Sequence, residues 1–359
     1  MFVAGIDAHT RYVVIVVVNK EGDRVLGPRR VKVTQPQRLV QTLAAYRPLD
    51  VVVETSSSWP WLHEVLSTTG VRFVLAYAKR LRAIAEANYK SDTIDAELLA
   101  RMQLARLIPE VYATPAGQRE WATLIRHRTT LVRQRTALGN RIHAQLHTRG
   151  LFIERGHLLT RAGRQWLRTE AWAALSAEQR RLTRTHVQLI ASLRPLIRAL
   201  DRRIAHVAAT IREAQLLQTI PGIGPHRALL ICAEVLPIER FRTPHHLASY
   251  AGLAPRSSQT GVRGVRHGPL PAGANRWLRG ALVRSVVSHV RTAPDSALSQ
   301  FYVACKTRLG WPVARVATAR KLARVIHAML RTKQGWHRTQ RQPQAENRNR
   351  GELPRTHAA

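Results

Sequence analysis

Four acidic residues are the strongest candidates for chemistry, because carboxylates are scarce in this chain and these four follow ordered patterns. Asp7 ends the apolar run Phe2-Val3-Ala4-Gly5-Ile6, and Glu54 ends another run of valines. Asp92 and Asp95 are three positions apart, a spacing that places both on one face of a helix. Carboxylates that converge from three segments repel each other unless a cation lies between them. The pattern therefore predicts a divalent-metal site.

The charge of the chain indicates what such a site would act on. Lys and Arg number 57 against 22 Asp and Glu, for a formal net charge of +35. This charge exceeds what solubility needs and is opposite to that of a nucleic-acid backbone, so DNA, RNA or both are the expected partners. Four acids can hold two Mg²⁺ ions that activate the attacking oxygen and stabilise the leaving one in phosphoryl transfer. Arg far outnumbers Lys, which suits phosphate binding but also follows from GC-rich codon usage.

Length, cysteine content and hydropathy exclude several classes of protein. With 359 residues the chain is long enough for two or three domains. Cys232 and Cys305 are its two cysteines, too few and too far apart for a disulfide framework or a zinc signature. No apolar stretch reaches the ~18 residues of a membrane span, and the start lacks a signal-peptide pattern. We expect a soluble protein of a reducing cytosol, with no membrane partner.

The first hundred residues alternate between strand and helix patterns. β-branched runs at 2–6 and 12–18 predict a hairpin. Further strands are expected at 24–34, 50–55 and 71–76, and helices near 37–46, at 61–68 and from about 92. This order is typical of an α/β layer with a mixed sheet, in which ligand crevices lie at strand ends.

Each acid by itself has a plainer interpretation. Asp92 or Asp95 can complement the dipole of a helix N-terminus, Asp7 can be a turn residue, and Glu54 can pair with an arginine. The combined order, an acid after each of two strands and then a helical pair, is harder to explain in this way.

The middle of the chain is helical. From about 118 to 212, apolar residues recur at helical spacing and predict two long helices joined by a smaller helical segment, arranged as an antiparallel coiled coil. The polar faces carry many arginines, with Arg126, Arg133, Arg180 and Arg202 among them. These faces are either simply solvated or follow phosphates along a nucleic acid.

A Pro-Gly-Ile-Gly turn introduces the C-terminal region. Gly222 and Gly224 precede an apolar helix at 228–235 and predict a helix–hairpin–helix whose backbone N–H groups bind a phosphate. The same glycines also fit an ordinary helix–helix turn.

Two sets of motifs resemble one known family. The N-terminal third of the chain resembles the RNase H-like fold of RuvC-like resolvases, with its opening strand and acids. It resembles more closely the transposases of the insertion sequence 110 family. The matching residues are Gly5–His9, Val53–Thr55 and Lys90–Ala96. The resemblance implies that Asp7, Glu54, Asp92 and Asp95 are the catalytic, Mg²⁺-binding DEDD acids. A second set of residues resembles the C-terminal transposase domain of the same family: Phe241, His246–Pro255 and Gly273–Arg279.

The second resemblance implies a further chemical group, a hydroxyl that attacks DNA and forms a covalent phosphoester. At the position of the usual serine this chain has Thr260, with Ser258 and Ser257 as alternative hydroxyls. Basic residues near this segment are expected to hold the scissile phosphate: Arg256, Arg263, Arg266, Arg276 and Arg279.

The expected organisation is a RuvC-like α/β domain at 1–110, a coiled-coil linker at 111–212, a mainly α-helical domain with a helix–hairpin–helix at 213–331 and a disordered tail at 332–359. By resemblance, the function is that of a prokaryotic, cytoplasmic, nucleoid-associated transposase that excises and inserts an insertion sequence. Its implied partners are donor and target DNA, a structured guide RNA and further copies of the chain in a dimer or tetramer. Two alternatives stay open: a resolvase-type nuclease that uses water, and a nucleic-acid-binding scaffold without activity.

Overall fold

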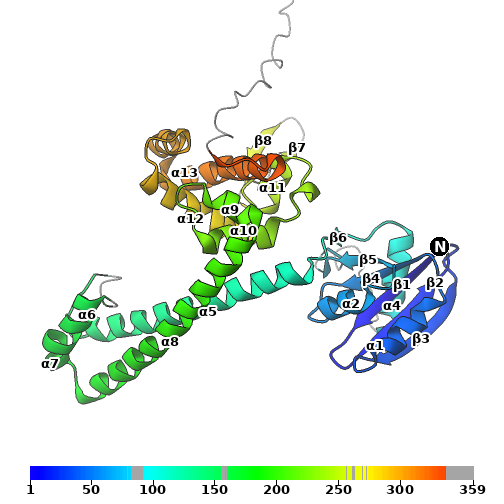
Figure 1. Ribbon diagram of the computed structural model, residues 1–359, viewed down its shortest axis with the longest axis horizontal. Helices are drawn as coiled ribbons and strands as arrows, with labels where there is room; N and C mark the ends of the chain where they lie inside the picture. Colours follow the sequence, from blue (N-terminus) through cyan, green and yellow to red (C-terminus); the bar gives the residue numbers. More distant parts are fainter. Residues whose placement is uncertain are drawn as a thin grey trace, which may run out of the picture. The chain divides into compact units, whose positions relative to one another are not determined.

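Figure 1 shows the computed structural model, which describes residues 1–78, 80–81, 92–154, 158, 160–255, 257–260, 263–268, 270–271 and 273–336. By their contacts the residues form two compact units, Met1–Gly117 and a second unit that begins at Gln118. The helices expected as a linker belong to the second unit. The described structure ends at Trp336, whose side chain is only 3% exposed, so the folded region extends beyond the expected boundary at 331. The rest of the expected tail lies outside the described residues.

The first unit contains a six-stranded sheet, which is mixed, as predicted. Its strands are β1 (Phe2–Ala8), β2 (Tyr12–Val18), β3 (Arg24–Lys32), β4 (Leu49–Glu54), β5 (Arg72–Ala76) and β6 (Glu110–Val111). They lie in the order β3-β2-β1-β4-β5-β6. β1 pairs antiparallel with β2 and parallel with β4. β6 was not expected, because two residues are too few to show an alternating pattern.

Helices cover both faces of this sheet, because the side chains that its strands direct to either face are mostly apolar. On one face, α1 (Pro36–Ala44) and α2 (Trp59–Leu66) pack against Ile6 and Val53. On the other face, α4 (Asp92–Leu104) packs against Val3 and Val52. A mixed sheet followed by mostly helical regions is consistent with the expected RNase H-like N-terminal domain.

Two long helices, α5 (Ala116–His147) and α8 (Ala177–Thr210), confirm the helical interpretation of the middle region. Their direction is antiparallel: Arg128 Nε donates to Asp201 Oδ1 at 2.8 Å, and Thr183 Oγ1 donates to Gln145 Oε1 at 2.6 Å. The segment that joins them contains α6 (Arg161–Trp166), a π-helical turn (Leu167–Ala171) and α7 (Trp172–Ala174). Coiled-coil packing of the pair stays a prediction.

The rest of the second unit is mainly helical around one apolar core. It comprises α9 (Arg212–Gln218), α10 (Pro225–Val235), a 3₁₀ turn (Ile238–Arg240), α11 (Pro244–Tyr250), the hairpin β7 (Ser257–Thr260) and β8 (Arg263–His267), α12 (Arg276–Thr292) and α13 (Ala297–Thr332). Every residue of α10 from Ala228 to Val235 is buried, and all of them except Glu234 are apolar. None of the described helices is both long and apolar enough to cross a membrane.

Candidate functional site

The sheet register brings Asp7 and Glu54 to neighbouring positions. Ile6 of β1 pairs with Val53 of β4, and each acid follows directly after its paired residue. Successive side chains of a strand alternate between the two faces. Since Val52 packs on the α4 side, Glu54 belongs to that side too, as does Asp7 two residues after Gly5. The two strand ends therefore direct their acids toward the face that α4 covers.

Gly5 allows α4 to approach this face closely. A Cβ at position 5 would lie 1.8 Å from the carbonyl oxygen of Ala96 and 2.9 Å from the backbone nitrogen of Ala100. Asp92 and Asp95 lie in the first turn of the same helix. The glycine of the opening strand thus sets the distance between β1 and the helix that carries the other two acids.

A histidine lies between two of the acids. His9 Nε2 is 2.9 Å from Asp7 Oδ2 and 3.3 Å from Asp92 Oδ2. The side chains of Asp7, His9 and Asp92 are 22%, 35% and 37% exposed, so the cluster is open to solvent on one side. His9 was not among the residues that the sequence singled out for chemistry, although it lies two positions after Asp7 in the motif Gly5–His9.

The hairpin next to β1 adds two more contacts to Asp92. Tyr12 donates its hydroxyl to Asp92 Oδ2 at 3.0 Å, and Arg30 Nη2 is 3.8 Å from the same oxygen. The rings of Tyr12 and His9 are 4.7 Å apart, and the Arg30 guanidinium lies 4.1 Å from the Tyr12 ring centroid. A layer of arginine, tyrosine and histidine therefore holds Asp92 beside Asp7.

Burial, and after it charge repulsion within the cluster, raise the pKa of Asp7. Burial raises the pKa of Asp7, the His9 ring opposes this rise, and the nearby carboxylates of Asp95 and Asp92 raise the pKa further. Asp95 is therefore close enough to Asp7 to influence it electrostatically. The hydrogen bond that Tyr12 donates to Asp92 favours the protonated phenol and so raises the pKa of the Tyr12 hydroxyl.

The donor set fits a divalent cation. Asp7, His9 and Asp92 each offer one ligand atom, and these atoms lie within 4.8 Å of one another. Carboxylate oxygens suit Mg²⁺, and an imidazole nitrogen is also accepted by Mn²⁺ and related ions. A cation among them would relieve the repulsion that raises the pKa of Asp7. Asp95 and Glu54 lie on the same side of the sheet, from which they can complete or extend the ligand set.

The segment with the candidate hydroxyls is a two-stranded hairpin in the second unit. Thr260 pairs with Arg263, Ser258 with Arg266 and Ser257 with His267. The backbone register thus pairs each candidate residue with a basic residue. Arg256 lies outside the described residues.

The Pro-Gly-Ile-Gly turn between α9 and α10 is held by α12. Gly222 has a φ of 85°, and a Cβ there would lie 2.6 Å from the backbone nitrogen of His289. The buried His289 donates from Nδ1 to the carbonyl oxygen of Pro221 at 2.9 Å. Gly224 is the N-cap residue of α10. Conformation and packing therefore account for Gly222, while phosphate binding by a helix–hairpin–helix stays a prediction.

The predicted nucleic-acid-binding arginines have different surroundings. Arg126 forms an ion pair with the buried Glu234, Nη2 to Oε1 at 2.8 Å. Arg279 donates to the carbonyl oxygens of Pro271 and Ala251 at 2.6 and 3.3 Å. These two arginines have structural partners, which the sequence did not reveal. Arg276 is exposed, as is Arg133, whose guanidinium lies 5.4 Å from the Trp277 ring centroid.

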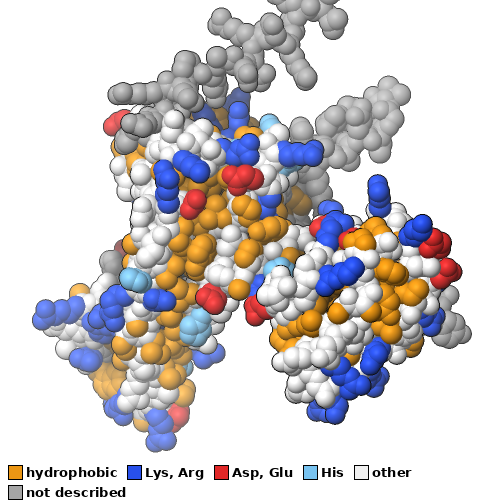
Figure 2. Space-filling model, turned by 45° about the vertical axis from the view of Figure 1, so that its right-hand side comes forward, with side chains coloured by type: hydrophobic (Ala, Val, Ile, Leu, Met, Phe, Trp, Pro, Cys, Tyr) orange, Lys and Arg blue, Asp and Glu red, His pale blue; other side chains and the backbone are white. Residues whose placement is uncertain are grey.

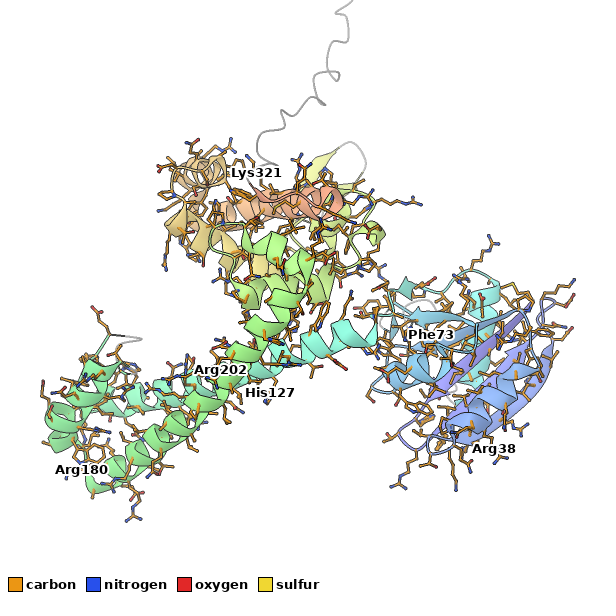
Figure 3. All side chains as sticks on the ribbon, viewed as in Figure 1. Arg38, Phe73, His127, Arg180, Arg202 and Lys321 are labelled. Atoms are coloured by element: carbon orange, nitrogen blue, oxygen red, sulfur yellow. The ribbon has the colours of Figure 1, made fainter. Side chains whose placement is uncertain are left out.

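The long helix α8 carries an arginine with structural partners and another that is exposed (Figure 3). Arg180 donates to the carbonyl oxygens of Trp172 and Ala173 and so fastens the end of α7. Arg202 is exposed. Figure 2 shows Lys and Arg side chains spread over the visible surface of both units, with few acidic ones. The face in view is thus predominantly basic, as the composition predicts.

Two family models match the chain. One of them, the IS110-type DEDD model described as "Transposase", matches residues 4–149, which include all four acids. The other, described as "Transposase IS116/IS110/IS902 family", matches residues 214–302, which include the hairpin. Together the two segments cover more than half of the chain.

Similar proteins of known name agree with these matches. The transposase for insertion sequence element IS1111A of Coxiella burnetii is 28% identical over 320 residues, 86% of this chain and 84% of that protein. The transposase for insertion sequence element IS1328 of Yersinia enterocolitica is 27% identical over 318 residues, 88% of this chain and 92% of that protein. A pilin gene-inverting protein of Moraxella bovis is 38% identical over 75 residues, 21% of this chain and 23% of that protein.

Proposed function

Because the chain belongs to the IS110 family of transposases, we propose that it excises and inserts a mobile insertion sequence with the acids of its first unit and a hydroxyl of its second. The observation that carries this proposal is the cluster of Asp7, His9 and Asp92, whose ligand atoms lie within 4.8 Å of one another. The strongly basic surface supports DNA as the substrate.

In this proposal Asp7, Glu54, Asp92 and Asp95 hold Mg²⁺, with one or two ions. Bound there, Mg²⁺ supplies Lewis-acid stabilisation of the charge that develops on the phosphoryl oxygens. Tyr12 and Arg30 hold the Asp92 carboxylate in place, since both contact its Oδ2. His9 bridges Asp7 and Asp92 and keeps the two carboxylates at a fixed separation.

The nucleophile in this proposal is the Thr260 hydroxyl, with Ser258 as the alternative. Its oxygen attacks the phosphorus of a DNA phosphodiester, a bond from phosphorus to Oγ forms, and the bond to one sugar oxygen breaks. The hydroxyl proton is removed in the attack, and the leaving sugar oxygen takes up a proton. Attack by the sugar hydroxyl of another DNA end then joins that strand and restores the side-chain hydroxyl, so the number of phosphodiester bonds is conserved.

The acids and the hydroxyl lie in different units of the chain. We propose that the acids of one subunit act with the hydroxyl of another in a homodimer or homotetramer. A structured RNA encoded by the element would select donor and target DNA in this assembly. Both points extend the family resemblance to this chain.

An excision assay tests the proposal. The gene is placed in cells with its native flanking DNA, and the rejoined donor junction and the excised element are counted by quantitative PCR. We expect Asp7→Asn, Glu54→Gln, Asp92→Asn and Asp95→Asn to reduce both products at least about a hundredfold, as the loss of groups that stabilise transition-state charge does. Glu21→Gln, a change at an exposed acid of the same unit, should leave excision unchanged. Normal excision by the Asp7 and Asp92 variants would overturn the role of the acids.

The flanking DNA also tests RNA guidance. Deletion of the transcribed non-coding end should abolish insertion, and supplying that RNA from a second plasmid should restore it. If insertion persists without the RNA, the guide is removed from the proposal and the transposase activity remains.

A further inference from the structure

A bend in α13 creates a groove on the second unit. Gly310 has φ 78° and ψ 164°, a conformation that interrupts the helix, and Pro312 opens the helix that follows. The groove beside this bend has a volume of about 930 Å³. Phe301 comes from the part of α13 before the bend, and Val313 and Val316 come from the part after it.

The floor of the groove is apolar, and part of it is exposed to solvent. Leu253 and Phe301 line it together with Val313, whose side chain is 49% exposed. Large apolar side chains gathered in a hollow, rather than scattered singly, mark a binding surface.

The wall of the groove is cationic. Arg320, Lys321 and Arg324 line it from α13, and Figure 3 labels Lys321 on this helix. Lys321 Nζ lies 4.5 Å from the ring centroid of Phe301, so one cation already faces the aromatic floor. None of the three forms an ion pair with a carboxylate of the described residues. Their charge is therefore available to an anionic partner.

An aromatic floor beside unneutralised cations matches an unpaired nucleotide. The base can stack on Phe301 while its phosphate meets the cations, the combination found in proteins that bind single strands. Duplex DNA would use the cations but leave the floor empty, because its bases stay stacked. An apolar peptide would use the floor but leave the cations unneutralised.

The groove also adjoins the candidate nucleophile segment. Pro255 and Gly268 line it, and they lie just before and just after the hairpin of β7 and β8. We infer that this groove binds an unpaired nucleotide of the DNA strand that the hairpin engages, with the base against Phe301 and the phosphate against Lys321 and its neighbours. The identity of that strand rests on the proposed function, whereas binding itself requires no cleavage.

Two exposed valines of α13 give a matched test. Val313 lines the groove, and Val303, 55% exposed on the same helix, does not. Fluorescence anisotropy of the full-length chain is measured with a labelled single-stranded DNA of about 12 nucleotides, the duplex of the same sequence and the corresponding single-stranded RNA. We expect Val313→Glu to weaken single-stranded DNA binding about tenfold, the effect of losing one stacked base, and to change duplex binding less than twofold. Val303→Glu should change neither.

Several outcomes would overturn the inference. Both valine changes could weaken single-stranded DNA binding equally, or neither could weaken it. Val313→Glu could weaken duplex binding as much as single-stranded DNA binding, or it could weaken only the binding of RNA. A photo-crosslink from 5-iodouracil in the DNA, mapped by mass spectrometry, should fall on Phe301, and a crosslink confined to other elements contradicts the site. These assays measure binding without cleavage, so a failure of the catalytic proposal, which the excision assay detects, is told apart from a failure of the groove.

Discussion

Gly5 of β1 and Ala96 of α4 approach so closely that a Cβ at position 5 would lie 1.8 Å from the Ala96 carbonyl oxygen. No other residue type fits without moving the helix, because the obstacle is backbone rather than the end of a flexible side chain. The first turn of this helix carries Asp92 and Asp95. A residue with no side chain therefore decides where two of the four candidate catalytic acids lie.

Gly5→Ala should separate α4 from the sheet. We expect the free energy of unfolding of the first unit to fall by about 1–3 kcal/mol or more, the cost of overpacking a close contact. Excision should fall as well, because Asp92 moves away from Asp7. Gly27→Ala is the control, since nothing lies within 4 Å of a Cβ at this position of β3. Urea denaturation measures the stability of both variants, and equal stability would contradict the contact.

Metal binding should depend on Asp7 and Asp92. Titration with Mn²⁺, followed by the loss of the free-ion electron paramagnetic resonance signal, should show an affinity at least about tenfold weaker in Asp7→Asn and Asp92→Asn. Tenfold is a lower bound, because the loss of a residue that only hydrogen-bonds to a metal ligand already weakens metal affinity 10- to 100-fold. Glu21→Gln should bind as the parent does. Unchanged affinity in both aspartate variants would place the metal elsewhere.

A covalent intermediate should depend on Thr260. A DNA substrate with a nick next to the cleaved phosphate traps the adduct, because the strand to be rejoined diffuses away. Thr260→Ala should abolish the protein–DNA adduct on a denaturing gel, and Thr260→Ser should retain it because the hydroxyl is kept without the crowding methyl group. An adduct that survives in Thr260→Ala but is lost in Ser258→Ala would transfer the role to Ser258. Cleavage without any adduct favours water as the nucleophile.

Arg126 should contribute to stability through Glu234. The Glu234 side chain is 8% exposed and accepts hydrogen bonds from Arg126 and from Asn275 Nδ2, the latter at 2.7 Å. Arg126→Ala should lower the free energy of unfolding by about 1–2 kcal/mol, a value reduced by the 47% exposure of Arg126. In Arg126→Ala/Glu234→Gln the loss should be smaller than the sum of the single changes. Arg133→Ala, at an exposed site, should cost under about 0.5 kcal/mol.

Stability should fall in mild acid because of His226. Burial, and after it the Arg128 guanidinium, lower the pKa of His226 to about 4, while Asp201 opposes the shift. The unfolded chain therefore takes up a proton near the ordinary pKa of 6.5, and the folded chain only near 4. Between these values the unfolded state binds more protons, so stability decreases as the pH falls. His226→Gln should reduce the difference between denaturant midpoints at pH 7 and pH 5, whereas an unchanged difference would contradict this role.

The strand and helix pattern of the first unit follows from local sequence. Runs such as Tyr12–Val18 favour the extended backbone state, since β-branched side chains pack well against their neighbours in a sheet. The acids Asp7 and Glu54 were recognisable because each interrupts such a run. Two long helices were equally predictable, because their apolar period extends over many turns.

The partners of individual side chains did not follow from local sequence. His9, Tyr12 and Arg30 meet at Asp92 because β3 pairs with β2 and α4 lies against β1, a relation between segments up to 83 positions apart. The pairing of Arg126 with Glu234 spans 108 positions. Such contacts depend on register and helix placement, which no short window contains.

The sequence by itself determined the first five strands, the two long helices, the positions of the four acids along the chain and a charge suited to DNA, because these depend on residue type and short-range spacing. Tertiary structure alone decided that Gly5 admits α4 to the sheet, that a histidine lies between Asp7 and Asp92, and that a groove beside the bend at Gly310 is lined by apolar side chains and three cations. The physical reason is that packing selects one arrangement among many that the same local patterns permit.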